Sequence, residues 1–190
     1  MDLQDQQSAK PSKDAPAMPG RRRFAGVGVI LTLASEPGMA AVMCKSPSGS
    51  LSGGLRSSPG GQNLVCGGLS PGYWKNHPDA WPRGVYPYKA PPQQATTFAS
   101  VFPFGSTKLY RTGTLMEVLE STDPSEDPYN FGFHLVAAYL NILSGKMNFL
   151  TVDRLKLMWH DVVAYGFYVP TAGSKWYAED VKRYLESTEN

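Results

Sequence analysis

The stretch PYNFGFHLVAAYLNILSG, residues 128–145, decides the fold because its apolar side chains recur at helical spacing. Such spacing predicts an amphipathic α-helix over 129–144. Gly145 is the expected stop, since glycine readily adopts the left-handed conformation in which many helices end. The residues expected to face a core are Phe131, Leu135, Ala138, Tyr139 and Ile142.

Three further segments repeat this periodicity. A short helix is predicted over 114–121, a longer one over about 152–165 that ends at Gly166, and a last one that begins near Ser174 as N-cap. The residues expected to face inward are Leu115, Val118 and Leu119, then Leu155, Met158, Trp159, Val162 and Val163, then Trp176 or Tyr177, Val181, Tyr184 and Leu185. We therefore predict a mainly α fold of about four helices around one core, in a helical domain that spans 69–190.

The region before these helices, 67–111, is rich in proline and aromatic residues. Proline lacks a backbone donor and disrupts both helix interiors and central strands. We therefore predict a long irregular N-terminal region of packed loops, with one helical turn at 95–101.

The N-terminal 40 residues have the pattern of a signal peptide. Three consecutive arginines precede FAGVGVILTLA (24–34), an uncharged run too short to span a bilayer as a helix, and Gly38 and Ala40 supply the small residues of a cleavage site. The RRRF sequence (21–24) fits the twin-arginine export pattern. We predict export to the periplasm or the extracellular space, with no transmembrane segment in the chain after cleavage.

The next segment, 41–68, is rich in Ser, Gly and Pro and holds the two cysteines of the chain, Cys44 and Cys66. In an oxidising compartment the simplest outcome is one disulfide that closes this segment as a loop. A redox-active pair would normally show close C-x-x-C spacing, which these cysteines lack. The expected role of the disulfide is structural.

The charge balance excludes two classes of partner. The chain has 18 Lys and Arg against 16 Asp and Glu, a net charge of +2. Nucleic-acid-binding domains and polybasic membrane surfaces carry a marked positive excess. We therefore expect no nucleic-acid partner.

The stretch LSPGYWKNHPDAWP, 69–82, concentrates large rings between prolines. Because Pro78 keeps His77 out of helical geometry, the segment has little conformational entropy to lose on ordering. We predict that its rings pack over the helices at 129–144 and 152–165, while Lys75, Asn76 and Asp79 make turn and capping contacts. If the stretch instead binds a partner, the side chains available are Tyr73, Trp74, Lys75, Asn76, His77 and Trp81.

Three short stretches carry a resemblance: GYWKNHPDAWP (72–82), LMEVLES (115–121) and HLVAAYLNILSG (134–145). Together they resemble a group of uncharacterised bacterial exported proteins. That group shares GYWK, then Asn or Thr, then HPxxWP, followed by a Leu-rich helix and a helix similar to QLIAAKLN. The resemblance implies secretion and a small helical domain, and it implies no catalytic activity. The chain departs from the pattern at Tyr139, where lysine is frequent, and in its longer aromatic stretch 83–111.

A metal site is the alternative that uses the three histidines of the chain. If the stretch 69–82 docks on the helices, His77, His134, His160 and Asp161 could converge. Three imidazoles and a carboxylate suit zinc with an open position for water, which would make the protein a metal-dependent periplasmic hydrolase. No H-E-x-x-H or similar paired spacing supports the set.

Other catalytic patterns are absent from the sequence. It has no G-x-S-x-G motif and no glycine-rich phosphate loop followed by lysine. Glu117 and Glu120 fit a solvated helix face better than a catalytic pair. We therefore expect a non-catalytic structural or partner-binding module without a cofactor, whose partner is a protein or a glycan. The rings expected to form its binding surface are Tyr86, Tyr88, Phe102 and Phe104.

Overall fold

The structure is a computed structural model that describes residues 47, 65–170 and 173–190. The predicted signal peptide, most of the segment 41–68 and Cys44 lie outside these residues, so export and the Cys44–Cys66 disulfide stay predictions. Within the described part, the chain forms seven α-helices and no strand longer than an isolated bridge. The mainly α prediction is confirmed.

The bounds of the helices are α2 Pro71–Asn76, α3 Phe98–Val101, α4 Lys108–Thr112, α5 Leu115–Glu120, α6 Phe131–Leu143, α7 Val152–Tyr165 and α8 Ala178–Glu186, with 3₁₀ turns at Pro78–Ala80 and Pro128–Asn130. The longest connections between the helices are 77–97, before α3, and 166–177, before α8. The four predicted helices are α5 to α8. The short helices α2 and α4 fall in the region expected to be irregular, while α3 covers most of the predicted turn at 95–101.

α2 forms because its proline stands where a helix tolerates it. Pro71 is at the start of the helix, where its missing N–H would have no intrahelical partner in any case. The Ser70 hydroxyl caps the helix by accepting from the backbone N–H of Tyr73 (3.3 Å). The segment then ends at His77, which precedes Pro78 and leaves helical geometry as predicted.

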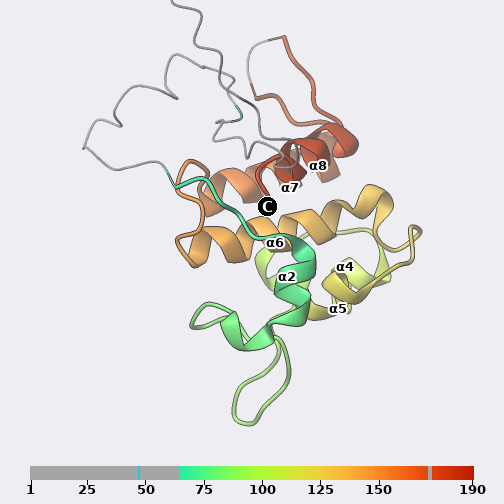
Figure 1. Cartoon of the computed structure of the whole chain (residues 1–190). Helices are drawn as coiled ribbons and strands as arrows, with labels where there is room; N and C mark the ends of the chain where they lie inside the picture. The colour runs from blue at the N-terminus through green and yellow to red at the C-terminus, as the bar shows by residue number, and fades with distance from the viewer. Residues whose placement is uncertain (1–46, 48–64, 171–172) are drawn as a thin grey trace, which may run out of the picture. The chain divides into compact units, whose positions relative to one another are not determined.

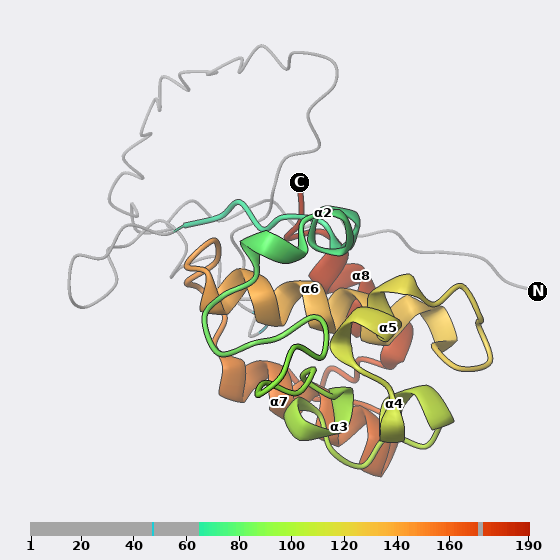
Figure 2. The ribbon, with the colours of Figure 1, turned by 90° about the horizontal axis from the view of Figure 1, so that it is seen from below.

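α6 is the central helix. It packs against α2, α5, α7 and α8, and it runs through the middle of the helices in both views (Figure 1 and Figure 2). In Figure 2, α2 lies on one side of α6, while α3, α4 and α7 lie on the other. Because α6 has neighbours on several sides, nine of its 13 residues are buried.

The start of α6 is fixed by a buried carboxylate. Tyr129 and Asn130 both have left-handed backbone angles (φ 62° and 56°), so the helix begins at Phe131, two residues later than predicted. The Asp127 side chain accepts from the backbone N–H groups of Gly132 (2.8 Å) and Phe133 (2.9 Å). It thus satisfies two donors that a helix N-terminus leaves unpaired.

The same carboxylate ties α4 to α6. The Tyr110 hydroxyl of α4 donates to Asp127, and burial together with that neighbouring charge raises the pKa of Tyr110. Gly132 makes room for the ring, because an added Cβ would lie 2.6 Å from Tyr110 Cε1. α4 and α6 can therefore approach this closely only with glycine at position 132.

α7 closes an aromatic core through Trp159. Leu155, Met158 and Trp159 are buried as predicted. Val163 is exposed (36%), so its predicted core position is wrong; the buried stripe of α7 is narrower than its apolar residues suggest. The rings around Trp159 are Phe98, Phe102, Tyr110 and Phe131, with centroids 5.0 to 6.2 Å away.

The last helix starts later than predicted. Tyr168 and Trp176 exchange two backbone hydrogen bonds of 2.8 Å, so the chain is still extended at 176 and Ser174 is not the N-cap. Tyr177 is the N-cap residue of α8, and its N–H donates to the Asp180 carboxylate (3.1 Å). The side chains of α8 predicted to face inward, Val181, Tyr184 and Leu185, are buried.

The two ends of the described chain meet beside α6. Gly68 forms a parallel bridge with Glu189, and the Asn190 N–H donates to the Gly68 carbonyl (2.7 Å). Cys66 forms a similar single bridge with Met147 after α6. Among the described residues, no helix is long and apolar enough to cross a membrane.

Candidate functional site

The two tryptophans of the GYWK motif, residues 72–82, are part of the core. Trp74 is only 1% exposed and Trp81 is buried beside it. The Trp81 indole N–H donates to the Trp74 carbonyl (3.0 Å), and the Trp74 indole N–H donates to the Asn141 side-chain oxygen (3.1 Å). Each ring therefore buries its apolar area and also satisfies its one polar group.

Asn141 of α6 is the polar anchor of this packing. It is fully buried, and besides the Trp74 indole it holds the backbone of Leu69 at both polar groups. Its oxygen accepts from the Leu69 N–H and its amide donates to the Leu69 carbonyl, each at 2.8 Å. One side chain thus fixes the segment that leads into α2 and the first indole of the motif.

The motif docks on a different pair of helices than predicted. α2 packs mainly on α5 and α6, not on α6 and α7. The face of α7 that carries Trp159 is already covered by rings from α3 and α4. The prediction that the motif's rings complete the helical core is confirmed for both indoles, with α5 in place of α7.

The remaining side chains of the motif are at the surface. Lys75, Asn76 and Asp79 are exposed, and the capping role expected for this group belongs to Ser70. His77 stacks on the half-buried ring of Tyr73, with centroids 4.2 Å apart, and its Nδ1 lies 2.9 Å from the Tyr73 carbonyl oxygen. The motif thus presents a polar outer face over a packed apolar inner face.

The three histidines lie in separate surroundings. His134 is buried, with Nδ1 2.9 and 3.1 Å from the two Glu189 carboxylate oxygens, whereas His160 is exposed and pairs with its neighbour Asp161 at 3.1 Å. No group of three or more His, Cys, Asp or Glu side chains that could hold a metal ion comes together in 65–170 and 173–190. The structure does not bring His77, His134 and His160 together, and the zinc hypothesis stays an untested prediction.

The buried pair of His134 and Glu189 attaches the C-terminal tail to α6. Burial raises the pKa of Glu189, and this effect outweighs the hydrogen bond from His134, which lowers it. Glu189 follows α8 and also forms the bridge to Gly68. The pair therefore connects both ends of the described chain to the central helix.

Three of the four rings predicted to form a binding surface are exposed. Tyr86, Tyr88 and Phe104 reach solvent, whereas Phe102 is fully buried and its predicted surface position is wrong. Phe102 directly follows α3, and its ring packs against Phe98, Tyr139 and Trp159. Irregular sequence gives no periodicity from which the alternation of buried and exposed rings could be read.

Phe104 is held in solvent by a rigid loop. Its side chain is 74% exposed, and its backbone is left-handed (φ 73°), which is unfavourable for any residue with a Cβ. On one side, the Trp159 indole N–H donates to the Pro103 carbonyl (2.6 Å). On the other, Gly105 is buried so tightly that an added Cβ would lie 2.3 Å from Tyr110 Cβ. The core therefore fixes both neighbours of a ring that contributes little to it.

Three residues of α7 extend the surface around this ring. The His160 ring lies 6.3 Å from that of Phe104 and 6.0 Å from that of Tyr165, in edge-to-face arrangements. Tyr165 is 66% exposed, and Asp161 adds a carboxylate beside the imidazole. We call Phe104, His160, Asp161 and Tyr165 the Phe104 surface. Sequence reasoning found Phe104 as a candidate, and it missed Tyr165 because that residue closes an amphipathic helix.

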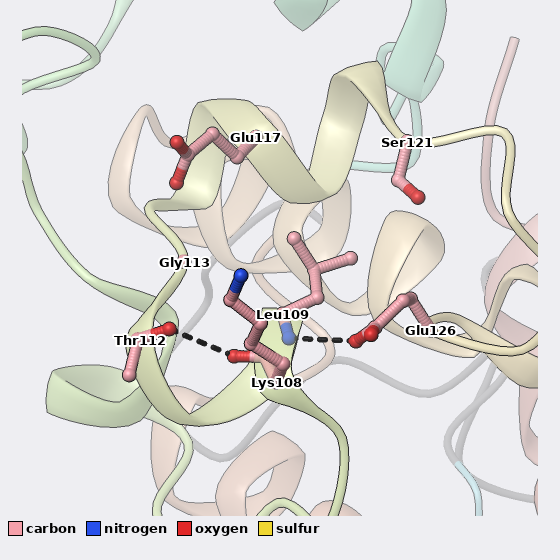
Figure 3. A pocket seen from close by; sticks show the side chains of 7 residues that line it. All are labelled: Lys108, Leu109, Thr112, Gly113, Glu117, Ser121 and Glu126. Atoms are coloured by element: carbon pink, nitrogen blue, oxygen red, sulfur yellow. Dashed lines mark hydrogen bonds between the residues drawn. The ribbon is translucent and has the colours of Figure 1, made fainter.

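A pocket of about 320 Å³ lies between α4 and α5. Figure 3 shows Glu117 and Glu126 on opposite sides of it, with Leu109 between them. Both carboxylates already serve helix starts: Glu117 accepts from the Thr114 N–H (2.7 Å) and Glu126 from the Leu109 N–H (2.8 Å). Their arrangement is explained by helix capping, without a ligand.

Comparisons with known proteins add no functional assignment. No family model, no curated protein and no solved structure matches the chain. The resemblance carried by the GYWK motif therefore stays a prediction. The structure does link two of the stretches that carry the resemblance. The Trp74 indole N–H of 72–82 donates to the Asn141 side chain of 134–145.

Proposed function

We propose that the protein is an exported, non-catalytic module that binds a partner through exposed aromatic side chains. The observation that carries this proposal is the position of Phe104, a large ring kept in solvent while the carbonyl of Pro103 is bound by the buried Trp159 and Gly105 is buried against Tyr110. The conspicuous GYWK motif is then the part that holds the domain together.

The energetics of Phe104 favour a role outside folding. Leaving a phenylalanine in water forgoes roughly 1.5–3 kcal/mol of burial, and a left-handed backbone at a residue with a Cβ costs on the order of 1–2 kcal/mol more. The contact with His160 at the protein surface returns only part of this. A ring already ordered in its exposed position binds a partner without a further loss of conformational entropy, which is the advantage of preorganisation.

The proposed location of the protein is outside the inner membrane. Export is supported by the sequence of the first 40 residues, with its arginines, short apolar run and small residues before the expected cleavage point. Cell fractionation combined with N-terminal sequencing of the mature protein tests it. A mature chain that begins near Ala41 outside the inner membrane is the expected result, and an intact N-terminus in the cytoplasm contradicts it.

Site-specific photo-cross-linking tests the binding role. The full chain is produced in its own cells with p-benzoylphenylalanine in place of Phe104, and the matched control carries it in place of Tyr177, an exposed ring at the start of α8. We expect a discrete adduct after irradiation at position 104 and none at position 177. Equal labelling at both positions contradicts the proposal, and so does the lack of an adduct at 104 in a protein that also binds no glycan.

A further inference from the structure

We infer that the ligand of the Phe104 surface is a neutral glycan. This inference rests on the proposed binding function and names the chemistry of its partner. Four observations carry it: an exposed ring on a loop fixed at both neighbouring residues, a second exposed ring on α7, hydrogen-bonding groups beside the rings, and the lack of a lysine or arginine among the four residues of the surface.

The two rings suit the apolar faces of sugars. A pyranose ring exposes a patch of C–H groups on each face, and these pack on an aromatic ring much as two apolar side chains do. Phe104 and Tyr165 are 74% and 66% exposed, and each ring is in an edge-to-face arrangement with the His160 ring. The surface therefore offers two stacking rings, one for each of two sugar residues of a chain.

The polar groups beside the rings suit sugar hydroxyls. A hydroxyl both donates and accepts, so it is best bound where donors and acceptors alternate. The His160 Nδ1 is paired with the Asp161 carboxylate, which leaves Nε2 and the second carboxylate oxygen available. The Tyr165 hydroxyl is a third group of this kind. All three belong to side chains that are exposed or half-exposed.

The chemical character of the surface argues against the other partners. The surface contains one carboxylate and one imidazole, so an acidic glycan or a nucleic acid would meet no lysine or arginine among these four residues. Charged groups are depleted from the cores of stable protein interfaces. Here the His160 imidazole, paired with the Asp161 carboxylate, lies near both exposed rings, in the place where a protein interface would keep its apolar centre.

Binding of defined oligosaccharides tests the inference. The mature protein is screened on an array of neutral oligosaccharides that includes cellohexaose, chitohexaose, xylohexaose and mannohexaose, with oligogalacturonate as the acidic comparison. Isothermal titration calorimetry then measures affinity for the best neutral probe. We expect saturable binding to at least one neutral chain and none to oligogalacturonate.

Three variants assign the binding to this surface. Phe104→Ala and Tyr165→Ala should each weaken binding about tenfold, which is the range expected for loss of one aromatic contact. Tyr177→Ala, at an exposed ring outside the surface, should leave affinity unchanged. All three variants should keep the wild-type circular dichroism spectrum, because none of these side chains is buried.

The outcomes of these experiments distinguish the glycan inference from the proposed binding function. If no neutral oligosaccharide binds while cross-linking at position 104 captures a protein, the binding role stands and the glycan inference is overturned. Glycan binding that survives both Phe104→Ala and Tyr165→Ala overturns the assignment to this surface. If neither glycan nor cross-linked partner is found, the proposed function falls as well.

Discussion

The GYWK motif and the Phe104 surface are both rich in aromatic side chains, but the tryptophans of the motif are buried and the rings of the surface are exposed. In the motif, Trp74 and Trp81 are buried, and each indole N–H finds an acceptor inside the domain. In the Phe104 surface, Phe104 and Tyr165 are mostly in water, and the core holds the neighbours of Phe104 instead of the ring itself. The comparison teaches that a dense aromatic motif can be structural, while a single ring in an unremarkable stretch is the better candidate for function.

The largest expected effect comes from removing both indoles. The double variant Trp74→Ala, Trp81→Ala deletes two buried rings, and each such deletion typically costs about 3–5 kcal/mol. We expect a chain that fails to unfold cooperatively or does so with a greatly lowered midpoint in urea, followed by circular dichroism. A midpoint equal to that of the wild type would show that the motif is not part of the core and would reverse the comparison.

Asn141 tests the polar half of the motif's packing. Asn141→Ala leaves the Leu69 backbone groups and the Trp74 indole N–H without their partners, and a buried unsatisfied group costs about 1–3 kcal/mol. We expect a loss of roughly 2–4 kcal/mol in the free energy of unfolding. Asn76→Ala, at an exposed position of α2, should change stability by less than about 0.5 kcal/mol. Equal effects of the two substitutions would contradict the anchoring role.

Substitutions of two helical glycines test the close packing of α4 on α6, with smaller expected changes in stability. Gly132→Ala places a Cβ 2.6 Å from the Tyr110 ring and should destabilise by about 1–3 kcal/mol. Gly72→Ala, in α2, meets only the Ser70 hydroxyl at 3.8 Å and should stabilise by about 0.5–1 kcal/mol. Thermal unfolding of the pair gives opposite signs if α4 and α6 are packed as described, and equal signs if they are not.

The smallest expected effect is a change in pH dependence at Glu189. Since burial raises the pKa of this carboxyl above its value in the unfolded chain, its stabilising contribution is present at low pH and is lost as the pH rises through the folded-state pKa. The charged groups that act on Glu189 are His134, Glu186 and Lys182. Glu189→Gln removes the titration.

The measurement is the free energy of unfolding between about pH 4 and pH 7, in wild type and variant. Relative to Glu189→Gln, the wild type should become less stable as the pH rises. Glu179→Gln, at an exposed position of α8, is the matched control and should run parallel to the wild type. A wild type that gains stability over Glu189→Gln with rising pH would mean that the bond to His134 dominates.

Periodicity predicted helices α5 to α8 but not α2 and α4. Helices α5 to α8 were recognisable because their apolar residues recur every three to four positions, and Gly145 and Gly166 do adopt left-handed angles where the helices end. α2 was missed because its proline was read as a block, although Pro71 stands at the helix start. Local sequence rules show that a proline disfavours a helix interior, but they do not show whether that proline lies before a helix or at its first position.

The candidate site was less predictable than the fold because it depends on distant contacts. Asn141 and Leu69 are separated by 72 positions, so nothing near either residue in the sequence indicates their pairing. The exposure of Phe104 follows from the fixation of its two neighbours by Trp159 and Tyr110, which belong to other helices. The sequence indicates Phe104 as a candidate, but only the folded chain distinguishes it from the buried Phe102.

Two phenylalanines only two positions apart give the most direct measurement. Phe102→Ala should lower the melting temperature by roughly 10 °C, because it removes a fully buried ring. Phe104→Gly should leave the melting temperature unchanged or raise it, because glycine relieves the left-handed strain and little buried area is lost. A fall in Phe104→Gly comparable to that in Phe102→Ala would show that Phe104 serves the core, and the division between a structural motif and a binding surface would be wrong.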